Sequence, residues 1–133
     1  MIAVDTNVLV HYATNDDPEQ GQRAMELLAD PSGIFISKTV LLELEWVLRS
    51  AFRLPRASIE RALLTILGLP NITAENGEQI ASALQYYGQG LDFADALHYA
   101  SSPHTGGFHT FDTNFAKRGQ KLGLNVHDAM TGL

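Results

Sequence analysis

Four acidic residues in this sequence have types and positions that suit metal-assisted chemistry: Asp5, Glu43, Asp95 and Asp112. Asp5 and Asp112 each end an apolar-rich run, MIAVD and GGFHTFD, whereas Glu43 and Asp95 lie in the helical runs TVLLELEWVLRS and DFADALHYA. Gathered carboxylates repel one another and lose hydration, so a fold that collects them generally does so to hold hard divalent cations. The four acids therefore predict metal-assisted phosphodiester chemistry.

Other polar residues near these acids have two open interpretations. Asn7 either orients a metal-bound water or caps a helix, and Thr39 is expected to begin the long helix as its N-cap. Asp92, one turn before Asp95, is interpreted as an N-cap in preference to a further pocket acid. Glu45 competes with Glu43, but two residues along a helix turn the side chain by ~200°, so only one of them faces a given pocket.

The charge balance is unusual for a protein that handles phosphates, because the formal net charge is −6. Basic residues nonetheless cluster in two places, at Arg49, Arg53, Arg56 and Arg61, and at Lys117, Arg118 and Lys121. Each cluster is either solvated helix surface or a guide for phosphate groups. Three residues are taken as candidate substrate guides: Arg49, Arg53 and Lys117.

Size and composition predict one domain over residues 1–133, since 133 residues with 45% apolar content suffice for a single core. The absence of cysteine excludes disulfides, thiolate zinc sites and a cysteine nucleophile. The start MIAVDTN has no basic segment, and no window reaches the ~18 apolar residues of a membrane span. We therefore expect a soluble, cytoplasmic protein with no membrane partner.

The elements that must position the acids alternate along the chain. Strands are predicted at residues 2–5, 33–37, 69–73, 106–111 and 124–126. Helical segments are predicted at residues 7–14, 18–29, 39–52, 57–67, 76–87, 93–102 and 114–122. This alternation favours a parallel sheet with helices on both faces, in which ligands bind at the carboxyl ends of the strands.

Four sequence blocks in this order resemble the PIN domain family: VDTNVLV, ISKTVLLELEWVL, DFADALHYA and TFDTNFAK. The closest resemblance is to the VapC-type toxin ribonucleases of toxin–antitoxin pairs, and it covers essentially the whole chain. It implies an α/β fold, a three-layer α/β/α sandwich with a central, mainly parallel five-stranded sheet. It also implies a Mg²⁺- or Mn²⁺-dependent endoribonuclease that uses metal-activated water and is neutralised by a cognate antitoxin.

The resemblance assigns a role to each matching residue. Asp5, Glu43, Asp95 and Asp112 would be the catalytic, metal-binding carboxylates, with Thr6, Asn7, Thr39 and Asp92 as possible accessory residues. One ion would be held by Asp5 and Asp95 with Asp112 or a water, and a second would lie nearer Glu43. A single octahedral site is the alternative. Without a metal role, Asp5 would cap the following helix, and Asp112 would cap a loop or pair with Lys117.

Two other functional classes compete with the nuclease hypothesis. A catalytically silent PIN-like binding scaffold would lack some of the acids, and all four are present. A receiver-type phosphoacceptor would need paired acids after its first strand, where Thr6 and Asn7 follow Asp5. The sequence does not specify which RNA is cut, and a homodimer is expected. Trp46 and Tyr99 are interpreted as core or interface aromatics in preference to base-stacking platforms.

Overall fold

The computed structural model describes residues 1–133 and contains five strands and seven helices, so the predicted α/β class is confirmed. The chain divides into two compact units, Met1–Gly77 and Glu78–Leu133, which are described separately. Every strand pair is parallel, as predicted. None of the seven helices has the length and apolar character needed to cross a bilayer.

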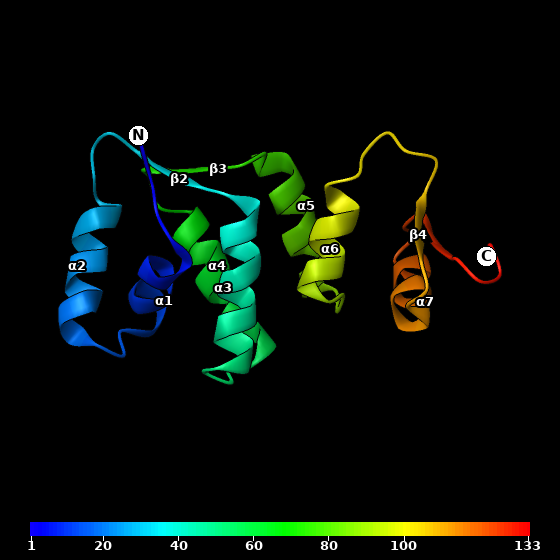
Figure 1. The fold of residues 1–133 in the computed structure, drawn as a ribbon, viewed down its shortest axis with the longest axis horizontal. Coiled ribbons are helices and arrows are strands. Elements are labelled where there is room, and N and C mark those ends of the chain that lie inside the picture. The colour runs from blue at the N-terminus through cyan, green and yellow to red at the C-terminus, as the bar shows by residue number, and fades with distance from the viewer. The chain divides into compact units, whose positions relative to one another are not determined.

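The first unit contains three strands and four helices (Figure 1). In chain order they are β1 (Ile2–Ala3), α1 (Thr6–Thr14), α2 (Pro18–Leu28), β2 (Ile34–Ile36), α3 (Lys38–Ser50), α4 (Arg56–Leu67) and β3 (Ile72–Ala74). The strands form one sheet in the order β1-β2-β3, with Ile34 of β2 opposite Ile2 and Ile72. The carboxyl ends of the three strands therefore lie at one edge of the sheet. Along the chain, Asp5 comes after β1, Ser37 after β2 and Glu75 after β3.

The core of this unit is formed by apolar residues at helical and strand spacing. Helix α1 packs against α2 and α3, and α3 packs against α4. On α4, Ile59, Leu63 and Ile66 are buried, as their spacing predicts. The other buried apolar residues here are Val4, Leu9, Val10, Ala24, Leu28, Ile34, Ile36, Leu41, Leu44 and Leu48.

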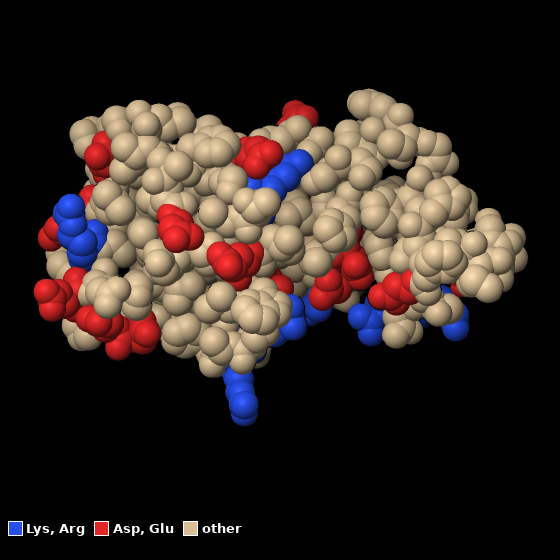
Figure 2. Space-filling view, viewed as in Figure 1, with Lys and Arg blue, Asp and Glu red and all other residues tan.

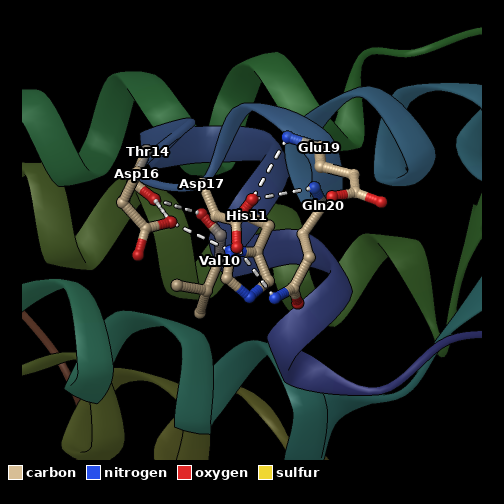
Figure 3. A network of polar contacts seen from close by, with 7 residues as sticks. All are labelled: Val10, His11, Thr14, Asp16, Asp17, Glu19 and Gln20. Carbon is tan, nitrogen blue, oxygen red and sulfur yellow. Dashed lines mark hydrogen bonds and ion pairs between the residues drawn. The ribbon is translucent and has the colours of Figure 1, made fainter.

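A polar network fixes the corner between α1 and α2 (Figure 3). His11 Nδ1 and the Thr14 hydroxyl both contact Asp16 Oδ1, at 2.9 and 3.0 Å. The hydrogen bond from His11 is the main cause of the lowered pKa of Asp16. Asp17 then caps α2 by accepting from the backbone N–H groups of Glu19 and Gln20. The hydrogen bonds of Asp16 and Asp17 thus fix the corner between α1 and α2, although both side chains stay accessible to solvent.

The second unit contains α5 (Gly77–Gly88, which begins at the boundary), α6 (Phe93–Ala100), β4 (Phe108–Thr110), α7 (Thr113–Lys121) and β5 (Val126–Asp128). Strands β4 and β5 pair with Phe108 opposite Val126. A chain of edge-to-face and tilted aromatic contacts runs from Tyr86 through Tyr99 and Phe108 to Phe115, with ring centroids 5.5–6.4 Å apart. These rings link α5, α6, β4 and α7 into one core.

Two details of the elements differ from the prediction. The five strands form two hydrogen-bonded sheets, one of three strands and one of two, whereas one five-stranded sheet was predicted. Each strand has only two or three residues, so few hydrogen bonds form between neighbouring strands. Helix α3 begins after Ser37, whose hydroxyl accepts from Val40 N at 3.3 Å, so the expectation that Thr39 is the N-cap is wrong. Ser37 caps the helix two residues earlier than predicted and satisfies the N–H group of Val40. The prediction of a single domain over residues 1–133 stays a prediction.

Candidate active site

Asp5 stands between β1 and α1 in the first unit. It is the N-cap of α1, with extended backbone angles, and its Oδ1 accepts from Thr6 N at 2.7 Å. The cap occupies one carboxylate oxygen, and the residue is exposed. Asp5 therefore caps the helix that follows it, as the alternative interpretation predicted. Its second carboxylate oxygen is compatible with a role as a metal ligand.

Thr6 presents a buried hydroxyl directly after Asp5. The residue is 4% exposed, and its Oγ1 has no hydrogen-bond partner. A buried hydroxyl without a partner costs about 1–3 kcal/mol, so such an atom calls for an explanation. A hydrated cation beside Asp5 would supply the missing partner. Asn7, the other accessory candidate from this motif, is exposed.

The two glutamates of α3 have opposite environments. Glu43 is exposed, whereas Glu45 is 3% exposed and accepts from Arg49 Nε at 3.0 Å. Helix rotation separates the two side chains, so the burial of Glu45 turns Glu43 outward. Glu43 thus remains available for a ligand, as its selection from the motif requires, while Glu45 has a structural partner.

In the second unit, two aspartates cap helices. Asp92 Oδ2 accepts from Asp95 N at 3.3 Å, which confirms Asp92 as the N-cap of α6. Asp112 follows β4 and caps α7 by accepting from Phe115 N at 3.1 Å. Asp95 lies in the first turn of α6 and is half-buried. As at Asp5, each cap uses one oxygen and orients the carboxylate at a helix N-terminus.

Asp95 is the carboxyl group whose pKa is raised. Burial raises its pKa to about 6, the negative charges of Asp92 and Asp112 add to the rise, and His98 opposes it. Three carboxylates of the second unit are therefore close enough to influence one another electrostatically. A bound cation would reverse this penalty, because it favours the ionised form of each acid.

The donor chemistry of these residues fits a hard cation. Carboxylate and hydroxyl oxygens, with Asn7 nearby, are ligands suited to Mg²⁺ or Mn²⁺ and not to a thiolate-binding metal. Neither unit by itself brings three or more acidic or histidine side chains into a formed metal cage. The joint metal-binding role of Asp5, Glu43, Asp95 and Asp112 remains a prediction.

The candidate phosphate guides have different surroundings. Arg49 donates from Nε and Nη2 to the two carboxylate oxygens of Glu45, at 3.0 and 3.4 Å. Helix α3 ends at Ser50, and Arg53 has a left-handed φ of 54° in the following turn. Arg53 therefore lies outside the helix that carries Arg49, and the two candidate guides do not share a helix face. Lys117 is exposed on α7, near Arg118 and Lys121.

Figure 2 shows basic side chains at several separate places on the visible face, most of them near acidic ones. No continuous basic surface is present in that view.

A concave surface lies within the first unit, between α1, α2 and α4. A hollow of about 440 Å³ is lined by Tyr12, Met25, Arg61 and Ile66 among others. An adjoining hollow of about 230 Å³ shares Tyr12 and Met25 and extends to Leu69 and Pro70. Because Met25 is 56% exposed, this groove presents apolar surface to solvent.

Three features of the site escaped sequence reasoning. Glu75 follows β3, and its carboxylate accepts from Lys38 N at 2.9 Å, which ties the start of α3 to the edge of the sheet. The ion pair of Glu45 with Arg49 was signalled by an i, i+4 spacing of opposite charges. Trp46 is 57% exposed, so it is not a core residue.

The order and placement of these residues agree with the comparison to known families. The sequence profile described as the PIN domain matches residues 2–121, which include all four candidate acids. This chain belongs to the PIN domain family.

Among solved structures, the crystal structure of Mycobacterium tuberculosis VapC20, a toxin that cleaves the sarcin–ricin loop, matches with a TM-score of 0.44. Its sequence is 20% identical, and the match covers 90% of this PIN domain and 95% of that chain. A likeness of this degree does not establish a shared activity. No curated protein sequence matches.

Proposed function

We propose that this PIN domain protein is a VapC-type endoribonuclease toxin that hydrolyses RNA phosphodiester bonds with Mg²⁺ or Mn²⁺. The observation that carries the proposal is the family match over residues 2–121, which includes the four acids of the predicted metal site. Asp5 and Asp112 each follow a strand and cap the next helix, so their carboxylates stand at helix N-termini. The raised pKa of Asp95 adds an electrostatic reason for a cation at these residues.

In the proposed mechanism, the four carboxylates would hold the cation, which when bound would supply an activated water and neutralise charge on the phosphate. The caps hold Asp5 and Asp112 in fixed orientations, so little conformational entropy is lost when they bind an ion. The Thr6 hydroxyl, which is buried and has no hydrogen-bond partner, would orient a water held beside Asp5. Glu43 stands on the exposed side of α3 and contributes a further oxygen ligand.

The proposed partners are RNA, a second copy of the chain and a cognate antitoxin that neutralises the toxin. An antitoxin needs a binding surface with exposed apolar groups that can be covered. The groove of the first unit, with Tyr12 and Met25 along it, is such a surface. Substituting Met25 with Glu should weaken antitoxin binding and leave RNA cleavage by the isolated toxin unchanged.

Cleavage assays with the purified protein test the proposed function. Structured RNA should be cut with Mg²⁺ or Mn²⁺, and EDTA should abolish the cut. Asp5→Asn and Asp95→Asn should each lower the rate by orders of magnitude with an unchanged circular dichroism spectrum. Asp16→Asn, which alters a carboxylate at the α1–α2 corner, is the matched control and should retain activity. Full activity in EDTA would overturn the metal mechanism, and RNA binding without cleavage would support the silent scaffold.

A further inference from the structure

The exposed indole of Trp46 is the feature of α3 that neither the core nor the proposed metal site uses. Trp46 is the only tryptophan of the chain, and 57% of it is accessible to solvent. Large aromatic side chains bury much apolar area and normally do so in a core or an interface. An indole left in solvent is therefore available as a contact surface for a partner.

The position of Trp46 on the helix relates it to Glu43. Residues three apart on a helix are surface neighbours, with about 5–6 Å between their Cβ atoms. Both Glu43 and Trp46 are exposed, whereas Leu44, Glu45 and Leu48 of the same helix are buried. One side of α3 is thus anchored, and the other presents a carboxylate followed by an aromatic ring.

The surroundings of Trp46 favour a nucleic acid over a second protein chain. Its exposed neighbours on α3 are Glu43, Arg49 and Ser50, and Arg49 is held in place by the carboxylate of Glu45. The core of a protein interface is depleted of charged residues, and a lone indole between charges does not form an apolar patch. An unpaired nucleobase matches this environment, because it stacks on an aromatic ring while its sugar and phosphate stay polar.

We propose that Trp46 is a stacking platform for an unpaired base of the RNA substrate. This base would lie next to the phosphate at the proposed metal site, to which Glu43 contributes a ligand. The inference rests on the proposed nuclease function and deepens it. A rigid 13-residue helix with four buried residues holds the indole, so binding requires little reorganisation. The platform selects RNA segments that are single-stranded, because paired bases do not offer a free face.

Fluorescence of the single tryptophan tests the platform directly. A short single-stranded RNA, titrated in EDTA so that the proposed metal-dependent cleavage is blocked, should quench the emission saturably. The same sequence in a duplex should quench it much less. Trp46→Ala, followed by labelled-RNA anisotropy, should weaken binding about tenfold, since stacking contributes about 1–3 kcal/mol per base. Trp46→Phe should stay within about threefold of wild type because it retains an aromatic face.

A matched control is Leu64→Ala, which removes another exposed apolar side chain, on α4, and should leave RNA affinity unchanged. Wild-type RNA affinity in Trp46→Ala would overturn the proposed platform. Tryptophan emission that changes with protein concentration but not with added RNA would overturn it as well. The two proposals fail separately. RNA binding that needs Trp46 without any Mg²⁺-dependent cleavage refutes the nuclease and keeps the platform, whereas cleavage with an unchanged KM in Trp46→Ala refutes only the platform.

Discussion

At the scale of single residues, several side chains of the candidate site have a structural role as well as a proposed chemical one. Asp5, Asp92 and Asp112 each cap a helix with one carboxylate oxygen. Capping fixes the carboxylate and leaves a second oxygen for another partner. A structural role for these aspartates is therefore compatible with metal binding, and substitutions must separate the two. Asparagine preserves the cap because it is as good an N-cap as aspartate, whereas alanine removes it.

The raised pKa of Asp95 predicts a pH-dependent cost to the metal-free fold. Its pKa rises from 3.8 to about 6 on folding, so its contribution to stability is present below pH 3.8 and is lost as pH rises through about 6. Asp95→Asn should therefore raise the metal-free melting temperature at pH 7.5 by about 2–4 °C. The gain should shrink at pH 4.5. A lower melting temperature for this variant at pH 7.5 would show that the charged carboxylate stabilises the fold.

Arg49 is predicted to contribute more to stability than to RNA binding, because it forms an ion pair with the buried Glu45. Arg49→Ala takes the guanidinium from Glu45, whose side chain is only 4% exposed, and should lower the free energy of unfolding by about 1–3 kcal/mol. Arg23→Ala breaks an exposed pair with Glu26 and should cost less than about 0.5 kcal/mol. Urea denaturation measures both. Equal small effects would place Arg49 among ordinary surface residues and restore its role as a phosphate guide.

At the scale of elements, α7 and β5 are held together by a close approach at a glycine. A Cβ on Gly119 would lie 2.9 Å from Val126 Cγ2 and 3.3 Å from its Cβ. Val126 is 1% exposed and has no room to retreat. The glycine thus lets the helix that Asp112 caps lie directly on its sheet, which positions that carboxylate at the end of β4.

Gly119→Ala should therefore destabilise the protein by about 1–3 kcal/mol, the usual cost of overpacking a core. Gly77→Ala is the matched control, since a Cβ at Gly77 has no neighbour within 4 Å. It should change stability little. The denaturant midpoint with a constant m-value measures both effects. A neutral Gly119→Ala would mean that α7 can shift away from β5 without loss.

At the scale of the whole molecule, metal binding by the proposed acids would affect stability as well as catalysis. The chain carries a formal charge of −6, and divalent cations at the acids reduce that self-repulsion locally. A ligand that binds only the folded state stabilises it by mass action, about 2.7 kcal/mol at one hundred times its Kd. Metal binding should therefore be visible in stability independently of catalysis.

Saturating Mg²⁺ or Mn²⁺ should raise the melting temperature by at least about 5 °C. Asp5→Asn and Asp95→Asn should each remove most of that shift, because each substitution removes a carboxylate charge of the proposed metal site. Asp16→Asn should keep it. A shift that survives one of the two substitutions would show that the acids bind separate ions. Differential scanning fluorimetry with and without EDTA gives these values.

Local signals in the sequence determined much of the architecture. The acid at the end of each apolar run, the alternation of strands and helices and the N-cap at Asp92 were all predictable, because strand length, helical spacing and capping involve residues close in the chain. The same signals located Asp5 and Asp112 at strand ends. The errors made from these signals are small and lie at element boundaries, where Ser37 and Thr39 are both residue types that cap helices.

Tertiary packing alone decided which side chains of those elements are buried. Glu45 is buried and Glu43 is exposed, although both lie in one helical run, because the neighbours of α3 cover only one of its sides. The same choice leaves Trp46 in solvent, and burial together with neighbouring charges raises the pKa of Asp95. Burial and electrostatic crowding depend on residues distant in the chain, and a single sequence does not specify which distant surfaces come together.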